Sequence, residues 1–445
     1  MHIGVHAASN PDKLALVVPQ SGYTQTFAQL NAAANRLSQL FRAAGLQPGD
    51  HVALCMENHD RYLEVLWGCQ FAGLVYTAAS SRLTSKELTY ILNDCEAKAF
   101  ITSKYKADQA AEIIGGSPNV AMRLMLDGVI PGYESYEDAV AQHSDVPLDN
   151  RIAGIDMLYS SGTTGLPKGV TKEFPNLPLD GSPTTVAPTL TMLFGFTPES
   201  VYLSPAPMYH AAPLRFTMAA QSMGCTAVVM EHFDPEEYLA AIQKNQVTHS
   251  QVVPTMFVRL LKLDESIRTK YDVSSLQAVI HAAAPCPIPV KKQMIEWFGR
   301  IIHEYYAGTE GNGMTVVGSD DWMAHKGTVG RPLPHVELRL ADDGEVLVRG
   351  PHMLGYLGEP APQGEWLGTG DLGLFEHGFL VLHGRKKHQF ITAFGRNVNP
   401  EWVEAELVQQ LPIAQAWLHG EALPGNLDVL EPRYPNNTHT QKSEE

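Results

Sequence analysis

Apolar residues in the first quarter of the chain recur with two different spacings. Between residues 27 and 41 they return every three or four positions, which places them on one face of a helix. Residues 51–56 (HVALCM) instead form a continuous apolar run, which is typical of a short buried strand. The two patterns alternate as far as residue 102, which predicts a largely parallel sheet covered by helices. Capping boxes precede two of the predicted helices, formed by Thr26 with Gln29 and by Thr84 with Glu87.

The alternation resumes near residue 200, and here several predicted strands run directly into loops of small residues. Residues 201–203, 277–281 and 301–306 have strand patterns, and loops containing Ala, Gly or Pro follow them. In open α/β sheets, ligands bind outside the carboxyl ends of the strands. We therefore expect the functional site at these strand ends.

Short β segments separated by turn residues replace this pattern from about residue 327. They are HVELRL from His335, EVLVRG from Glu345 and GFLVLHG from Gly378. They predict a small antiparallel subdomain at about 327–384, which closes a large N-terminal domain of residues 1–384. Residues 385–387 form a predicted hinge, and residues 388–445 a truncated α+β C-terminal domain. In that last domain a helix is predicted from Asn399 through Gln410, and composition predicts disorder for the last fifteen or so residues.

Composition and charge narrow the class of protein. The chain has 445 residues, 44% of them hydrophobic and 18% charged, as in a folded globular protein. Its formal net charge of −16 argues against a general nucleic-acid binder and against electrostatic adhesion to anionic membranes. The five scattered cysteines have no metal-ligand spacing, and neither a signal peptide nor a membrane-spanning run is apparent. These features predict a cytoplasmic protein with reduced thiols. The oligomeric state is left open.

A glycine- and hydroxyl-rich stretch, MLYSSGTTGLPKGV at residues 157–170, carries the strongest chemical signal. Its first three residues have the character of a strand end. The glycines permit positive φ angles, successive backbone N–H groups can surround an anion, and Lys168 adds a positive charge. The stretch therefore predicts a polyphosphate-binding loop. The alternative is an ordinary turn between two strands.

This loop differs from the phosphate-binding loop of the P-loop nucleotide triphosphatases. That loop has Gly-Lys followed by Ser or Thr and opens a helix. Here Pro167 precedes Lys168 and Gly169 follows it, and the next residues are β-branched. We expect no helix after Lys168, so any grip on phosphate must come from the loop and its lysine.

The same stretch resembles the signature of the adenylate-forming enzymes, which include acyl-CoA synthetases, amino-acid-activating domains and luciferases. Further family motifs follow in the family's order across roughly residues 10–407. They are Pro207-Met208-Tyr209-His210, Ala282-Ala283-Ala284-Pro285, Tyr306-Ala307-Gly308-Thr309-Glu310, Thr369-Gly370-Asp371, and Gly384-Arg385 with Lys387 at the hinge. The set is most similar to bacterial fatty-acid and carboxylic-acid CoA ligases. The resemblance implies ATP, Mg²⁺ and coenzyme A as cofactors and a small carboxylic acid as substrate.

The resemblance also implies a role for each residue around the phosphates. Thr163, Thr164 and Lys168 would bind the β- and γ-phosphates, and Thr309 the α-phosphate. Glu310 would be the Mg²⁺ ligand, a role that suits a carboxylate beside phosphate oxygens. The rest of the loop would line the phosphates with Ser160, Ser161, Gly162 and Gly165.

The nucleoside and the acyl group would be held by residues from other motifs. Tyr306 would stack on adenine, with the backbone of Ala283 and Ala284 along the adenine edge. Asp371 would accept hydrogen bonds from the ribose hydroxyls beside Arg385, and His210 would lie near the acyl carboxylate. The acyl pocket would be lined by Tyr209, His210, Ala211, Leu214, His281, His303 and Tyr305. These residues are mostly apolar or aromatic, so a hydrophobic acid is expected, with Arg215 or His303 available for a second polar group.

One family feature has no counterpart here. Family members usually carry a second essential lysine after a glycine near the end of the C-terminal domain. Beyond Arg396 the only lysine is Lys442, which no glycine precedes, so the role is not transferred to it. Two alternatives to a CoA ligase are considered, and the missing lysine motivates the second. One is adenylation with an amine or carrier-protein acceptor, and the other is a non-catalytic adenylate-binding paralogue.

Overall fold

The structure is a computed structural model, and it divides the chain into two compact units. Unit 1 comprises Met1–Phe233, Lys244–Gln251 and Leu354–Ala361, and unit 2 comprises Asp234–Gln243, Val252–Met353 and Pro362–Glu445. The residues that it describes are 1–160, 167–171, 174–181, 186–308, 315–350, 355–359, 364–388, 390–391, 397–398, 400–410, 413–419, 427–432 and 442–444.

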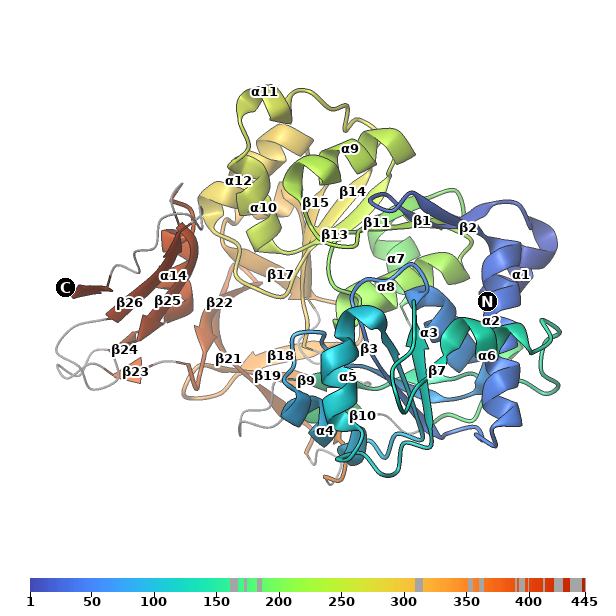
Figure 1. The fold of residues 1–445 in the computed structure, drawn as a ribbon. Helices are drawn as coiled ribbons and strands as arrows, with labels where there is room; N and C mark the ends of the chain where they lie inside the picture. Colours follow the sequence, from blue (N-terminus) through green and yellow to red (C-terminus); the bar gives the residue numbers. More distant parts are fainter. Residues whose placement is uncertain are drawn as a thin grey trace. The chain divides into compact units, whose positions relative to one another are not determined.

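Unit 1 contains a six-stranded sheet whose strand pairings are all parallel (Figure 1). In sheet order its strands are β7 (Glu134–Ser135), β6 (Met122–Leu126), β5 (Ala99–Ser103), β3 (His51–Cys55), β4 (Val75–Ala78) and β8 (Ile155–Asp156). Its helices are α2 (Phe27–Ala43), α3 (Tyr62–Ala72), α4 (Ser85–Asp94), α5 (Ala107–Ile113) and α6 (Tyr136–Ala141). The predicted alternation of helix and strand is confirmed, and both capping boxes form.

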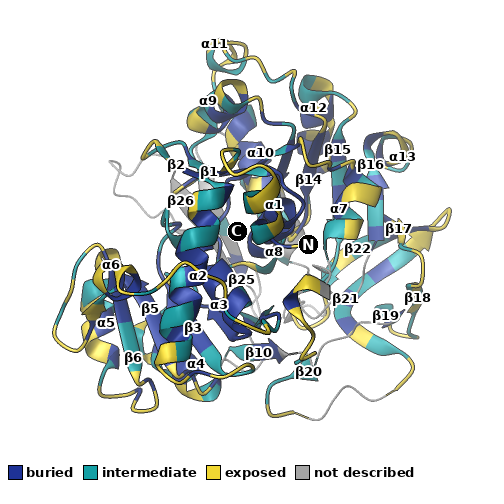
Figure 2. Ribbon diagram, turned by 90° about the vertical axis from the view of Figure 1, so that its right-hand side faces the viewer, coloured by how far each residue is buried: buried dark blue, intermediate teal, exposed yellow. Residues whose placement is uncertain are grey.

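The central strand β3 is buried on both faces, which explains its continuous apolar run (Figure 2). Val52 and Leu54 belong to one hydrophobic cluster, which includes residues of α2 and α3. Ala53 and Cys55 point the other way, into a second cluster that includes residues of α4 and α5.

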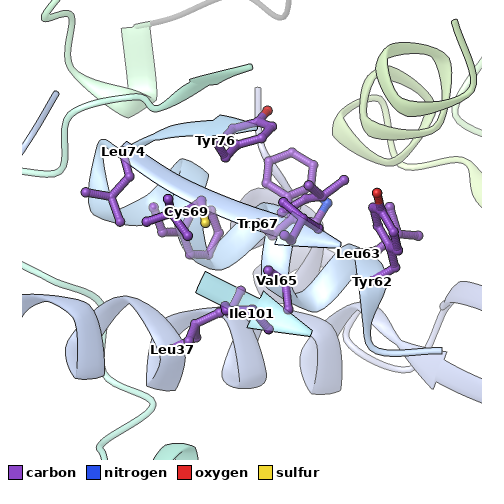
Figure 3. Close-up of a cluster of buried hydrophobic side chains, with 14 of the residues drawn as sticks. Leu37, Tyr62, Leu63, Val65, Trp67, Cys69, Leu74, Tyr76 and Ile101 are labelled. Atoms are coloured by element: carbon purple, nitrogen blue, oxygen red, sulfur yellow. The ribbon is translucent and has the colours of Figure 1, made fainter. Parts of the chain in front are cut away.

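Helices α2 and α3 both contribute to this core, part of which Figure 3 shows in close-up. Apolar residues surround α3 on all sides, and nearly every residue from Tyr62 to Ala72 is buried. A Cβ atom added at Gly68 would lie only 2.6 Å from Cδ2 of Leu37 on α2. The glycine is therefore required by the close approach of the two helices.

A second parallel arrangement in unit 1 carries the strands that begin near residue 200. In order it contains β13 (His249–Val252), β11 (Val201–Ser204), β12 (Thr226–Val229) and β1 (Leu14–Val18), with β2 (Tyr23–Thr26) antiparallel to β1. The other helices of this unit are α1 (Ile3–Ser9), α7 (Ala187–Phe194) and α8 (Ala211–Ser222). The predicted strands are found within one or two residues of their predicted ends, the usual uncertainty of a boundary.

Unit 2 joins one parallel pair of strands to an antiparallel series. β14 (Ala278–His281) and β15 (Ile302–Tyr306) are parallel. β15 then continues, in sheet order, through β16 (Thr315–Gly318), β17 (Thr328–Pro332), β22 (Phe379–Arg385), β21 (Leu367–Glu376), β19 (Glu345–Arg349) and β18 (Glu337–Leu340). All of these later pairings are antiparallel, as predicted for the residues after 327. The helices near them are α9 (Pro235–Asn245), α10 (Pro254–Leu261), α11 (Glu265–Arg268), α12 (Ile288–Phe298) and α13 (Ser319–Ala324).

The last part of the chain contains α14 (Pro400–Leu407), the strand pair β23 (Phe390–Ile391) and β24 (Asn397–Val398), and a three-stranded sheet. That sheet is formed by β25 (Ile413–His419), β26 (Leu427–Pro432) and β27 (Lys442–Glu444). Residues 431–432 and 442–444, which belong to β26 and β27, fall within the last fifteen residues, for which composition predicts disorder. Strand pairing uses backbone groups, so a polar composition does not prevent it. The other residues of that segment lie outside the described part.

Two further expectations concern thiols and membranes. The five cysteines are free, and Cys55, Cys69, Cys95 and Cys225 are buried. Among the described helices, none combines the length and the apolarity that crossing a bilayer requires.

Candidate active site

The glycine-rich stretch connects two strands of a hairpin. β9 (Leu158–Ser160) and β10 (Lys168–Thr171) are antiparallel, and Ser160 lies opposite Lys168. Lys168 thus opens a strand, which confirms that no helix begins there. The predicted phosphate-binding residues between them lie outside the described residues, namely Ser161, Gly162, Thr163, Thr164 and Gly165.

The hairpin is anchored within unit 1 by Tyr159. Its hydroxyl donates a hydrogen bond to Oδ2 of Asp94, at the end of α4, at 2.5 Å. Gly169 lies opposite Tyr159, and a Cβ there would be 3.1 Å from Cζ of the tyrosine ring. The close packing across this pair explains the glycine that follows Lys168.

The Lys168 side chain is engaged by a neighbouring short strand of the same unit, β20 (Gly355–Tyr356), and by the turn after it. β20 pairs with β10 through Val170 and Tyr356. Lys168 Nζ lies 2.7 Å from Oε1 of Glu359 and 5.2 Å from the centre of the Tyr356 ring. This lysine, expected to bind phosphate, is thus paired with a carboxylate of the protein itself.

Unit 2 brings together three of the predicted nucleotide-binding residues. Tyr306, at the end of β15, donates its hydroxyl to Oδ2 of Asp371 in β21 at 2.5 Å. Arg385 lies opposite Asp371 on β22, and its Nε is 3.1 Å from Oδ1 of the same carboxylate. An aromatic ring, a carboxylate and a guanidinium therefore meet at one place, which suits an adenine ring and its ribose.

The Thr369-Gly370-Asp371 motif belongs to a strand whose backbone is tightly fixed. The Thr369 hydroxyl donates to the carbonyl of Val346 at 3.0 Å, and the Asp371 N–H donates to the same hydroxyl at 3.1 Å. Gly370 has φ +76° and donates its N–H to Glu345 at 3.0 Å. The motif thus fixes the position of the Asp371 carboxylate.

The Ala282-Ala283-Ala284-Pro285 segment follows β14 and precedes α12. His281 and Glu304 are register partners in β14 and β15, so this segment leaves the sheet beside Tyr305 and Tyr306. Ala283 has φ +77°, a conformation that glycine adopts without strain but alanine rarely adopts. The backbone of Ala283 and Ala284 thus lies next to the Tyr306 strand end, where the adenine edge is expected.

A buried charged cluster lies beneath this strand end, and sequence reasoning missed most of it. Lys291 on α12 is fully buried, its Nζ lies 2.5 Å from Oε2 of Glu304, and it faces the ring of Trp322 at 4.8 Å. His281 is fully buried beside Phe257, with ring centres 5.3 Å apart. The signal that could have found the pair is Glu304 itself, the one acidic residue in the predicted strand 301–306.

Burial disfavours the charged forms of the two histidines on β14 and β15, His281 and His303. Neither ring nitrogen of His281 has a hydrogen-bond partner among the described residues, and Nε2 is 3.6 Å from Glu304. Burial places the pKa of His281 well below its usual value, and Lys291 lowers it further. Burial also lowers the pKa of His303. Burial thus favours the neutral form of both His281 and His303.

Tyr305 lies in β15, and the other four predicted acyl-pocket residues lie at or near the start of α8 in unit 1. His210 is the N-cap residue of this helix, is exposed, and has its ring centre 4.5 Å from that of Tyr209. Ala211 is half-buried and Leu214 is buried in the hydrophobic core. Tyr209 and Ala211 thus offer an aromatic and aliphatic surface next to one exposed imidazole.

Arg215, on the same helix, is held by an acid of unit 1. Its Nε and Nη2 donate to Oδ2 of Asp156 at 2.9 and 2.7 Å. Only 22% of the Arg215 side chain and 11% of the Asp156 side chain are exposed. The positive charge that could have recognised a second acidic group is thus balanced within the protein.

Three predicted site residues remain, namely Lys387, Thr309 and Glu310. Lys387 is exposed in the turn after β22, next to Lys386, whose ammonium is paired with Asp343 and Glu345. Thr309 and Glu310 lie outside the described residues, so the predicted Mg²⁺ ligand has no described geometry.

Comparison with known proteins supports the resemblance over nearly the whole chain. A feruloyl-CoA synthase of Amycolatopsis sp is 30% identical over 416 residues, which cover 88% of this chain and 80% of that protein. A 2-succinylbenzoate–CoA ligase of Bacillus pumilus (strain SAFR-032) is 28% identical over 429 residues, 92% of this chain and 82% of that protein.

Solved structures show the same fold. The o-succinylbenzoate CoA synthetase of Bacillus subtilis, in complex with its acyl-adenylate intermediate, matches with a TM-score of 0.80 and 22% identity. The match covers 98% of this chain and 89% of that one. The family described as AMP-binding enzyme matches residues 4–357. The chain therefore belongs to the AMP-binding family of adenylate-forming enzymes.

Proposed function

We propose that this protein is an AMP-forming carboxylic acid–CoA ligase. The observation that carries the proposal is the meeting of Tyr306, Asp371 and Arg385 in one chain of the AMP-binding family. The curated relatives compared above are CoA ligases or synthases by name. The reaction would join a carboxylic acid to AMP and then to coenzyme A.

In the first step, the substrate carboxylate attacks the α-phosphorus of ATP and pyrophosphate leaves. Tyr306 would stack on adenine while Asp371 accepts hydrogen bonds from the ribose hydroxyls. Lys168 would neutralise charge on the leaving pyrophosphate, which is a positioning and electrostatic contribution. Bound Mg²⁺, for which Glu310 is the proposed ligand, would neutralise further phosphate charge.

In the second step, the thiol of coenzyme A attacks the acyl carbon and AMP leaves. Asp371 and Arg385 would hold the nucleotide through both steps, because their contacts are made to the nucleoside. His210, exposed at the start of α8, is proposed to lie beside the acyl carboxylate. Lys387, exposed after β22, is the proposed hinge residue between the two steps.

The proposed substrate is a hydrophobic acid with a single carboxylate. Tyr209 and Ala211 offer apolar surface, while burial favours the neutral form of His281 and His303. The Arg215 charge is already balanced by Asp156. A second carboxylate on the acyl group would therefore lack a positive partner among these residues, and burying it unpaired is costly.

A panel of carboxylic acids tests the proposal, scored by pyrophosphate release with and without coenzyme A. We expect acid-dependent release in the full chain, thioester product when coenzyme A is present, and a steep loss in Lys168→Ala. Release that needs an added amine would instead identify an amide-forming enzyme. Binding of AMP without turnover of any acid would identify a non-catalytic adenylate-binding protein.

A further inference from the structure

The turn after β20 brings the Glu359 carboxylate to the Lys168 ammonium. β20 pairs with β10, and the Leu357 N–H donates to the Gly169 carbonyl at 2.8 Å. The Glu359 N–H then donates to the Tyr356 carbonyl at 3.1 Å, which closes a four-residue turn. Gly358 occupies the third position with φ +73°, as a type II turn requires. The turn directs Glu359 back toward the start of β10.

The Lys168 ammonium therefore has two partners from one short segment. The Glu359 carboxylate lies 2.7 Å away, and the Tyr356 ring adds a cation–π contact at 5.2 Å. Lys168 is 29% exposed and Glu359 45% exposed, so both remain accessible to a ligand. A negative charge thus sits where a polyphosphate would be recognised.

We propose that Glu359 competes with polyphosphate for Lys168. The carboxylate neutralises the ammonium when no polyphosphate is bound, and takes the ammonium back when pyrophosphate leaves. This inference rests on the proposed function, in which Lys168 binds the β- and γ-phosphates. The Glu359 carboxylate would then act as a counter-ion that lowers the affinity for ATP and pyrophosphate, so that pyrophosphate can leave.

The direction of the effect follows from electrostatics. Either the polyphosphate displaces Glu359 and breaks an ion pair, or the two anions share the three ammonium protons and repel each other. In both cases Glu359 weakens polyphosphate binding. Partly exposed ion pairs are worth little, so removing the carboxylate should tighten binding only about two- to fivefold.

Calorimetry on the full chain tests the inference, with α,β-methylene-ATP as the probe and AMP as the reference ligand. In Glu359→Gln we expect about two- to fivefold tighter binding of the triphosphate analogue and unchanged binding of AMP, which lacks the β- and γ-phosphates. Glu376→Gln is the matched control, because this acid is exposed on β21 and makes the same change in net charge. It should change neither affinity.

The Lys168→Met background separates this inference from the proposed function. There the analogue should bind more weakly, and adding Glu359→Gln should have no further effect. If Lys168→Met leaves analogue binding unchanged, the proposed role of Lys168 is wrong and this inference is wrong with it. If Lys168→Met weakens binding but Glu359→Gln also weakens it or leaves it unchanged, only the competition is wrong. Thermal unfolding of each variant checks that the fold is intact, and Glu359→Asp should bind more like the parent.

Discussion

The Tyr306 hydroxyl donates a hydrogen bond to the Asp371 carboxylate at 2.5 Å, although the two residues come from strands β15 and β21. The residue proposed to stack on adenine thus directly orients the residue proposed to bind ribose. Arg385 contacts the other oxygen of the same carboxylate at 3.1 Å. One side of the proposed nucleotide site is therefore organised around the Asp371 carboxylate.

This arrangement predicts a graded response of nucleotide binding. Asp371→Ala removes the acceptor and leaves Arg385 without its partner, so AMP affinity should fall about tenfold or more. Tyr306→Phe keeps the ring and removes only the hydroxyl, so the loss should be about two- to fivefold. Calorimetric titration with AMP measures both. Equal losses in the two variants would contradict the proposed division of roles.

The buried pair of Lys291 and Glu304 predicts a strong asymmetry in stability. Lys291→Met leaves the Glu304 carboxylate buried without its ammonium, which should lower the free energy of unfolding by about 3–5 kcal/mol. The double variant with Glu304→Leu removes both charges and should recover most of that loss. Urea unfolding followed by circular dichroism measures each value.

Lys292, the exposed neighbour of Lys291, supplies the control Lys292→Met, which should be close to neutral. A single variant as stable as the parent protein would show that the pair is not a buried charged unit.

The contact between Arg215 and Asp156 predicts how acid selectivity can be changed. Asp156→Asn removes the balancing charge, so turnover of an aromatic dicarboxylic acid should rise relative to its monocarboxylic analogue. A change of about fivefold is expected for a partly buried charge pair. Pyrophosphate release with the two acids gives the ratio. The gain should disappear when Arg215→Met is added, and an unchanged ratio in Asp156→Asn would argue against Arg215 lying near the acyl group.

The close approach of α2 and α3 predicts a steric cost at Gly68. A methyl group there would lie 2.6 Å from Leu37, so Gly68→Ala should lower the free energy of unfolding by about 1–3 kcal/mol. Gly115→Ala is the matched control, because a Cβ at Gly115 would meet no atom within 4 Å. Denaturant unfolding of both variants makes the comparison. Equal stabilities would mean that Leu37 moves aside at no cost.

Local sequence patterns determined many of the helices and strands of the fold. The capping boxes at Thr26 and Thr84, the apolar helix faces and the strand runs each depend on a few neighbouring residues, and each formed as predicted. The family motifs likewise identified Tyr306, Asp371 and Arg385, although no spacing in the chain says that they meet. Composition does not report which backbone a segment can pair with, and β27 falls in the segment for which composition predicts disorder.

Tertiary structure alone decided the partners of the charged groups. Lys168 with Glu359, Arg215 with Asp156, and Lys291 with Glu304 are separated by 191, 59 and 13 residues, so no helix or strand period connects them. The sequence identified Lys168 and Arg215 as available cations, whereas the fold neutralises each with a carboxylate. An ion pair depends on the distance between two side chains and on their exposure to water, and both are set only when the strands and helices pack.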